Sequence, residues 1–180
     1  MSKTWFTADP HFNHANIIKY ENRPFENTEE MNKEIIKRFN SKVKRQDKLI
    51  IAGDFGLGSW EQLTPLVSQI NGHKILVMGN HDKKNIAMWM EAGFAEVYRY
   101  PIIFKDFLMV SHNPLYVNEN MPYVNIFGHV HSHPSYETWS RAGVCVSVER
   151  HNYYPVNFDD IMEYFSGKVE RKKLHDPHHN

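Results

Sequence analysis

The chain has 180 residues and 12 histidines, several of which stand with aspartate or asparagine in short polar clusters. Five clusters each follow a short apolar run, and they span Asp9 to His11, Gly53-Asp54, Gly79 to Asp82, His112, and Gly128 to His131. Carboxylate, amide oxygen and imidazole, with no thiolate among them, suit Mn²⁺, Fe, Zn²⁺ or Ni²⁺ rather than a structural cysteine site. These residue types therefore point to metal-ion chemistry.

The candidate ligands are too numerous for one ion that keeps an open coordination position. They are Asp9, His11, Asp54, Asn80, His112, His129 and His131. Two ions that share a bridging carboxylate fit this set. Ions roughly 3.5–4 Å apart stabilise both the attacking and the leaving oxygen of a phosphoryl displacement, and they lower the pKa of bound water toward about 7. We expect two divalent ions, with Mn²⁺ favoured and Fe, Zn²⁺ or Ni²⁺ as alternatives.

The apolar runs that precede the clusters have the character of strands, and amphipathic segments separate them. Strands are predicted over residues 3–8, 48–52, 74–78, 96–104, 107–111, 123–127 and 143–148, and helices over 28–43, 59–70, 83–92 and 157–165. Asn27 with Glu30 is placed like a capping box, and Ser59 with Gln62 opens the second helix. Strand–helix alternation followed by hairpins, one of them turning at Lys105-Asp106, predicts an α/β fold with mixed sheets.

The clusters stand at the carboxyl ends of the predicted strands, where ligands bind in open α/β sheets. Pro10 biases Asp9 toward extended backbone, in which Asp9 and His11 project to the same side. His129 and His131 have the same spacing. We therefore expect the five clusters to converge on one site. Glycines at positions 53, 79 and 128 let the backbone turn sharply or approach a ligand closely there.

Length and composition bound the remaining properties. The chain fits one domain over residues 1–167, followed by a charged, His-rich tail over 168–180 that we expect to be flexible. Lys+Arg and Asp+Glu both number 21, so no net cationic field draws the protein to nucleic acid or anionic membranes. No apolar run approaches the roughly 18 residues of a spanning helix. A single cysteine, Cys145, fits a reducing compartment, and we expect a cytoplasmic monomer or homodimer without a membrane partner.

The five motifs, taken in order, resemble those of the calcineurin-like metallophosphoesterase superfamily, which run D-x-H, G-D, G-N-H-[DE], an isolated His and G-H-x-H. Here they stand as Asp9-Pro-His11, Gly53-Asp54, Gly79-Asn-His-Asp82, His112 and Gly128-His-Val-His131. Each motif alone is a weak signal, whereas the ordered set is highly specific. The segment from Asp9 to Phe25 is similar to the short, uncapped bacterial and phage branch of the superfamily.

The resemblance implies a four-layer αββα sandwich of two mixed sheets flanked by helices. It also implies ligand roles: Asp9, His11 and His131 for the first ion, Asn80, His112 and His129 for the second, and Asp54 as the bridge. A hydroxide between the ions would attack phosphorus. His81 would contact the phosphoryl group with Asn80 and, as general acid, protonate the leaving oxygen.

Two further residues near the first motif are candidates for substrate contact. Protein phosphatases of the superfamily carry an arginine shortly after the G-D motif, but the stretch from Gly53 to Ser59 has no basic residue, which argues against a phosphoprotein substrate. Arg23 could bind phosphate bidentately instead, or form an ordinary surface salt bridge. His14 could line the pocket or support it from behind.

The sequence thus predicts a dimetal-dependent hydrolase of small phosphoric esters, including nucleotides. A phosphodiesterase is favoured by analogy with the small uncapped members, and a phosphomonoesterase or nucleotidase is the alternative. A non-catalytic scaffold that keeps the fold is the rival from another class. A nucleic-acid binder that uses the basic stretch near residue 40 is disfavoured by the balanced charge, so nucleic acid is expected only as a substrate.

Overall fold

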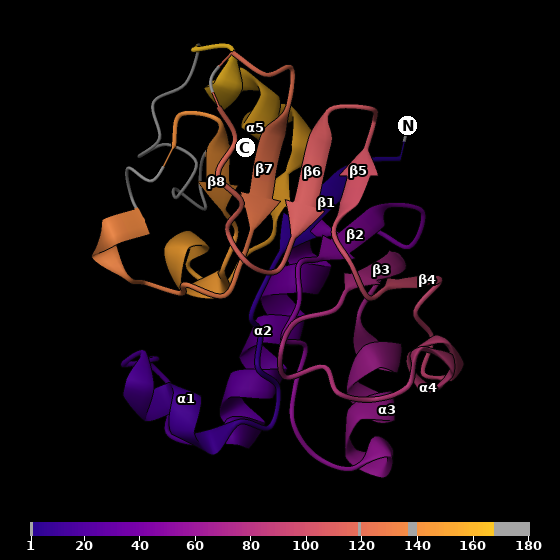
Figure 1. Ribbon diagram of the computed structural model, residues 1–180. Helices are drawn as coiled ribbons and strands as arrows, with labels where there is room; N and C mark the ends of the chain where they lie inside the picture. The colour runs from indigo at the N-terminus through magenta and orange to yellow at the C-terminus, as the bar shows by residue number, and fades with distance from the viewer. Residues whose placement is uncertain (1, 119, 137–139, 168–180) are drawn as a thin grey trace.

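The computed structural model describes residues 2–118, 120–136 and 140–167, so the predicted tail over 168–180 lies outside the described residues (Figure 1). The elements, in order, are β1 (Thr4–Thr7), α1 (Ala15–Tyr20), α2 (Thr28–Lys42), β2 (Lys48–Ile51), α3 (Trp60–Gln69), β3 (His73–Val77), α4 (Ile86–Glu91), β4 (Glu96–Tyr98), β5 (Ile102–Phe104), β6 (Leu108–Ser111), β7 (Val124–Phe127), η1 (Pro134–Tyr136), β8 (Gly143–Cys145), η2 (Val148–His151), β9 (Val156–Asn157) and α5 (Phe158–Phe165). In this part of the chain no helix is both long and apolar enough to cross a membrane.

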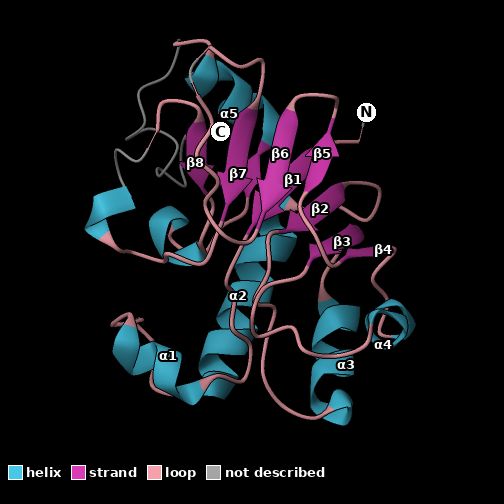
Figure 2. Cartoon of the chain, in the orientation of Figure 1, coloured by secondary structure: helices cyan, strands magenta, loops and turns pink. Residues whose placement is uncertain are grey.

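The strands form two sheets, which Figure 2 shows one above the other. The first has the order β4-β3-β2-β1-β9, with all neighbours parallel except β9. The second has the order β5-β6-β7-β8, with only β5 antiparallel to its neighbour. Both sheets are therefore mixed, as predicted for this α/β chain.

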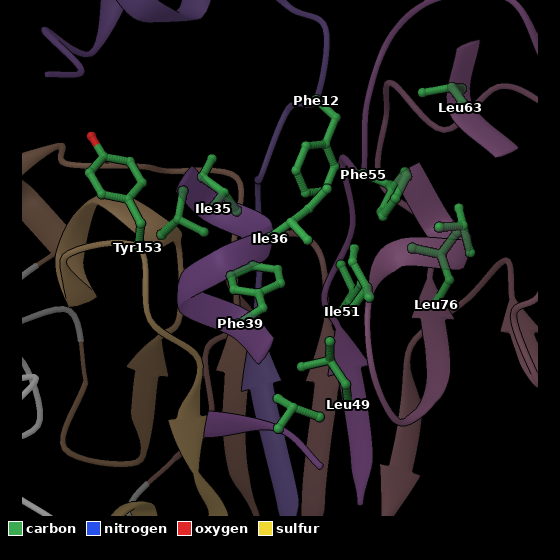
Figure 3. Close-up of a cluster of buried hydrophobic side chains, with 14 of the residues drawn as sticks. Phe12, Ile35, Ile36, Phe39, Leu49, Ile51, Phe55, Leu63, Leu76 and Tyr153 are labelled. Atoms are coloured by element: carbon green, nitrogen blue, oxygen red, sulfur yellow. The ribbon is translucent and has the colours of Figure 1, made fainter. Parts of the chain in front are cut away.

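Alternate residues of the central strands feed two different cores. In β2, Ile50 joins Phe6, Val110 and Ile126 in the core between the sheets, where the rings of Phe6 and Phe104 meet edge to face at 6.0 Å. The neighbouring β2 residues point the other way, toward α2 and α3 (Figure 3). A strand buried on both faces needs apolar residues at every position, which explains the continuous run in its sequence.

The core under the helices covers the outer face of the first sheet. Figure 3 shows Ile35 and Phe39 of α2 beside Leu49 and Ile51 of β2, and Leu63 of α3 belongs to the same core. On the other side, α5 contacts β1 and β9 and contributes Ile161 to the core between the sheets. The expected arrangement of two mixed sheets flanked by helices is confirmed.

Local sequence signals set several element ends. The side chain of Asn27 accepts a hydrogen bond from the amide of Glu30 at 2.9 Å and caps α2. Gln62 accepts one from the amide of Ser59 at 2.8 Å, in the reciprocal pattern of a capping box at α3.

Other boundaries differ from the prediction. The single strand expected over 96–104 is wrong: it is two strands, β4 in the first sheet and β5 in the second, with Pro101 between them. Proline has no amide hydrogen for a sheet ladder, and here it lies where the chain passes between sheets.

Because Phe104 pairs with Leu108, the hairpin turn also includes Phe107. Lys105 and Asp106 have the positive φ angles, 52° and 69°, that tight hairpin turns require.

Three further elements differ from the prediction because they are short. The strand expected over 143–148 ends at Cys145, and η2 begins at Val148. The six-residue α1 and the two-residue β9 were not predicted, because elements of that length carry too little periodicity to recognise.

Candidate metal centre

The candidate ligands come from loops at the carboxyl ends of five strands. Parallel β1, β2 and β3 lead into the loops that carry Asp9, Asp54 and Asn80, and parallel β6 and β7 lead into His112 and His129. Two tight groups result: Asp9, His11 and His131 in one, and Asp54, His112 and His129 in the other. Within each group, the potential ligand atoms lie within 4.8 Å of one another.

Five of the seven candidate ligands adopt positive φ angles, a conformation that costs non-glycine residues free energy and clusters at functional sites. They are Asp9 (57°), His11 (50°), Asp54 (53°), His129 (68°) and His131 (47°). The expectation that Pro10 keeps Asp9 extended is therefore wrong. Hydrogen bonds to the G-D loop fix the turn instead, because Asp9 N donates to Gly53 O at 3.0 Å and His11 N donates to Asp54 O at 3.1 Å.

Two buried atoms of the first group have no hydrogen-bond partner among the described residues. Asp9 Oδ2 accepts hydrogen bonds from His129 N at 2.8 Å and from Ser147 Oγ at 2.5 Å. Its other oxygen, Oδ1, and His11 Nε2 are buried and have no hydrogen-bond partner among the described residues. A buried carboxylate oxygen and an imidazole nitrogen left in this way suit a cation.

The second group gathers around His112. Its Nδ1 lies 3.0 Å from the carbonyl oxygen of Ala52, which makes Nδ1 the donor and leaves the lone pair on Nε2. Asn80 Oδ1 lies 2.8 Å and His129 Nδ1 lies 3.0 Å from this Nε2. Burial lowers the pKa of His112 and favours the neutral ring. Several electron-pair donors therefore face one another, an arrangement that a metal ion satisfies.

Asp54, a member of the second group, also faces the first group. Its Oδ2 is 3.5 Å from His11 Nε2 in the first group and 3.4 Å from His112 Nε2 in the second. Its Oδ1 accepts a hydrogen bond from His81 N at 2.8 Å. One carboxylate oxygen thus faces a ligand nitrogen from each group, as a bridging ligand requires.

The electrostatics of the first group favour a positive charge. Burial raises the pKa of Asp9 to about 8, so its ionised form needs a compensating cation. Burial, together with the charge of His131, lowers the pKa of His11 well below its usual range. Burial alone would also lower the pKa of His131, but its hydrogen bond to Glu149 and the charges of Asp9 and Glu149 raise it to about 9. A proton or a metal ion can supply the positive charge at this position.

His81 and His14 lie at the partly exposed side of the centre. The His81 ring is 5.3 Å from the His11 ring and 6.0 Å from the His14 ring. His14 Nδ1 lies 3.3 Å from His11 Nδ1. His81 and His14 are half-buried, whereas Asn80 and His129 are exposed, so this is the side from which a substrate can approach.

The structure places Arg23 away from this open side. Its side chain is fully buried, and its guanidinium donates to the carbonyl oxygens of Asp9 and Pro10 and to Glu149. Neither of the two expectations for Arg23, a phosphate contact or a surface salt bridge, agrees with this geometry. All of these hydrogen bonds point into the protein interior. Arg23 therefore supports the backbone of the first motif from its buried side.

Three residues of the centre had no predicted role. Asp82 accepts hydrogen bonds from the amides of Asp54, Phe55 and Gly79 at 2.7, 2.9 and 2.8 Å, and so joins the second and third motifs. A side chain at Gly79 would clash with Asp54.

Ser147 and Glu149 are the other two residues without a predicted role, and they come after the apolar run that begins at Gly143. That run is a sixth strand end followed by polar residues, which is the signal that could have identified them.

Two facing mixed sheets with these candidate ligands at the carboxyl ends of their strands are typical of the metallophosphoesterase class. The family model of the calcineurin-like phosphoesterases matches residues 2–176, and the chain belongs to this family.

Relatives extend over all or part of the chain. An uncharacterised protein of Methanocaldococcus jannaschii is 38% identical over 180 residues, which cover 95% of this chain and 96% of that protein. The Gene 66 protein of Mycobacterium phage L5 is 36% identical over 85 residues, or 46% of this chain and 41% of the phage protein. The crystal structure of AQ665 from Aquifex aeolicus, a protein of unknown function, matches with a TM-score of 0.72 and 25% identity, over 91% of this chain and 99% of that one.

Proposed function

We propose that this protein hydrolyses phosphoric esters with two divalent metal ions, and that its substrates are phosphodiesters. The position of Asp54 carries the proposal, because its Oδ2 faces His11 Nε2 and His112 Nε2 at 3.5 and 3.4 Å. The buried, unpartnered atoms of Asp9 and His11 support the same assignment. Membership of the calcineurin-like phosphoesterase family is consistent with this chemistry.

We assign the ligands by the group in which each lies. Asp9, His11 and His131 would hold the first ion, Asn80, His112 and His129 would hold the second, and Asp54, which faces both groups, would be shared by the two. When bound, a pair of divalent ions supplies Lewis-acid stabilisation of the phosphoryl oxygens and activation of water. The oxygen and nitrogen donors suit Mn²⁺, Fe, Zn²⁺ or Ni²⁺, and of these we propose Mn²⁺.

His81 is the proposed general acid. Its ring lies 5.3 Å from that of His11, and its main chain is fixed by the hydrogen bond to Asp54. A half-buried imidazole beside the ligands can reach the oxygen that leaves phosphorus and give it a proton. Asn80 and His14, on the same open side, are proposed to contact the phosphoryl oxygens.

The preference for diesters rests on charge. Arg23 is committed to Asp9, Pro10 and Glu149, so it adds no positive charge on the open side. Burial lowers the pKa of His14 and favours its neutral form. A singly charged diester needs less compensating charge than a doubly charged monoester. Small phosphodiesters, and nucleic acid as a phosphodiester, are therefore the proposed substrate classes. We also propose a cytoplasmic location.

Turnover of bis-p-nitrophenyl phosphate and of p-nitrophenyl phosphate, each measured with Mn²⁺ and with a chelator, tests this function. We expect Mn²⁺-dependent hydrolysis, faster for the diester, and loss of activity with the chelator. Faster turnover of the monoester would make the protein a phosphomonoesterase or nucleotidase. Stoichiometric metal binding without hydrolysis of phosphate esters would favour the scaffold alternative.

A further inference from the structure

Glu149 connects the two loops that form the first ligand group, although it belongs to none of the five motifs. It lies in η2, and its side chain is only 5% exposed. Its Oε1 accepts hydrogen bonds from Arg23 Nε at 3.0 Å and Arg23 Nη2 at 2.5 Å, and it lies 3.0 Å from His131 Nδ1. A single carboxylate oxygen therefore contacts both a buried cation and a candidate metal ligand.

Arg23 extends this connection to the first motif. Its Nη1 donates to the carbonyl oxygen of Pro10 at 2.7 Å, and its Nη2 donates to that of Asp9 at 2.8 Å. Those carbonyls belong to the strained turn in which Asp9 and His11 have positive φ angles. The guanidinium thus links the backbone that positions two ligands to the carboxylate that contacts the third.

The contact between Glu149 and His131 also determines how the ring faces the ligand group. With Nδ1 donating its proton to the carboxylate, the lone pair lies on Nε2, the atom left for a metal ion. In the second group, the neutral carbonyl of Ala52 has the corresponding role for His112. His129, the other histidine of that group, is an exposed residue. The first group is therefore held by a buried ion pair and the second by a weaker, neutral contact.

We propose that Glu149 is a positioning residue that, together with Arg23, prearranges the first ion site and makes its affinity higher than that of the second. This inference rests on the proposed function, because it takes Asp9, His11 and His131 as ligands of one ion. Outer-shell partners of metal-binding histidines contribute roughly 10–100-fold to metal affinity.

A different assignment of Glu149 is as a direct ligand. Glu21, His131 and Glu149 also lie close enough together to hold an ion. The guanidinium of Arg23 already supplies a positive charge to Glu149, and Glu21 accepts hydrogen bonds from Ser132 N at 3.3 Å and Ser132 Oγ at 2.5 Å. The other oxygen of Glu149, Oε2, is buried without a hydrogen-bond partner among the described residues, and it is the atom that a direct ligand would use. The contact of Oε1 with Arg23 favours the positioning role, and the experiment separates the two assignments.

The test measures Mn²⁺ binding to the full chain, both by equilibrium dialysis and by the electron paramagnetic resonance signal of free Mn²⁺. We expect two ions of unequal affinity in the unaltered protein. Glu149→Gln keeps the shape of the side chain. It should lower the affinity for the tighter ion about 10–100-fold and leave the affinity for the weaker ion unchanged. Glu21→Gln is the matched control, since it removes a carboxylate from the same region without altering the ring contact, and both affinities should stay within about threefold.

A double-mutant cycle distinguishes positioning of His131 from general damage. In a His131→Ala background, Glu149→Gln should change the affinity of the first ion by less than about threefold, because the ring on which it acts is absent. If Glu149→Gln does not fold, Arg23→Lys serves instead, since it keeps the charge but loses the forked contact, and it should weaken the same ion.

The outcomes separate the inference from the proposed function. Failure of the unaltered protein to bind any divalent ion would refute the proposed function itself. Two ions bound with unchanged affinities in Glu149→Gln would refute only the role of Glu149. Two other results would also refute the positioning role of Glu149. One is an equal loss of affinity for both ions in Glu149→Gln, and the other is a third bound ion that is lost in both Glu149→Gln and Glu21→Gln.

Discussion

The amide of His81 donates a hydrogen bond to Oδ1 of Asp54 at 2.8 Å, which ties the proposed proton donor to the proposed bridging carboxylate. The second oxygen of the same carboxylate faces His11 and His112. Asp54 therefore fixes the main chain of His81 with one oxygen, while its other oxygen faces candidate ligands of both groups. The contact uses the His81 backbone, so substitution of either side chain tests a separate part of the mechanism.

Removal of the His81 side chain should impair turnover without removing metal. We expect His81→Ala to lower kcat by about 10²–10⁴-fold, as for loss of a general acid. An ester with an alkyl leaving group should be affected more than one that releases p-nitrophenolate, whose oxygen needs no proton. Kinetics on both esters, with metal analysis of the same samples, checks this. A parallel loss of metal would instead identify His81 as a ligand.

Substitution of Asp54 by asparagine should remove metal as well as turnover, unlike substitution of His81. Asp54→Asn keeps an oxygen that can accept the hydrogen bond from His81 N, but it removes the negative charge shared by both ions. We expect both ions to be weakened and turnover to be lost, while the chain without metal still folds. Metal content after dialysis and a thermal melt provide the readouts. Retention of two tightly bound ions would exclude a bridging role.

The strained backbone of His129 predicts a difference in stability between two variants that both remove this proposed ligand. His129 is exposed and has a φ of 68°. Glycine adopts this conformation freely, whereas alanine pays about 1–2 kcal/mol for it. Without metal, His129→Gly should therefore have a higher free energy of unfolding than His129→Ala by about 1 kcal/mol, measured by urea denaturation. Equal stabilities would show that this turn stores no strain.

Asp47 gives a pH-dependent prediction away from the metal centre. It accepts hydrogen bonds from Lys3 N at 2.8 Å, Lys44 N at 2.9 Å and Trp5 Nε1 at 3.2 Å. Burial opposes ionisation of Asp47, but these hydrogen bonds outweigh it and hold its pKa below the usual value. Its contribution to stability is therefore present above the unfolded-state pKa of about 3.9 and is lost as the pH falls through the lower, folded-state value.

We expect Asp47→Ala to lower the free energy of unfolding by about 1–3 kcal/mol at pH 7, and by less at a pH below the folded-state pKa. Urea denaturation at several pH values measures this difference. Glu91→Gln, at an exposed position, is the control and should change stability by less than about 0.5 kcal/mol. If Asp47→Ala lowers the free energy of unfolding equally at every pH, the charge of the Asp47 carboxylate contributes nothing to stability.

The elements that the sequence predicts well are those with strong local signals. The run before Asp54 reads as a strand buried on both faces because its alternate residues enter two cores. The capping residues Asn27 and Ser59 mark the starts of α2 and α3. The division of the strand expected over 96–104 was missed, since assignment of β4 and β5 to different sheets is a long-range property.

The sequence by itself determined the residue types of the centre and their order along the chain, because a donor set of Asp, Asn and His after successive strands suits few chemistries. Only the tertiary structure decided the roles of Arg23 and Glu149. They are 126 residues apart in the chain and 2.5 Å apart in space, so no local pattern links them. Burial is the physical reason: a guanidinium cut off from water must find its partners inside the protein, and folding supplies them.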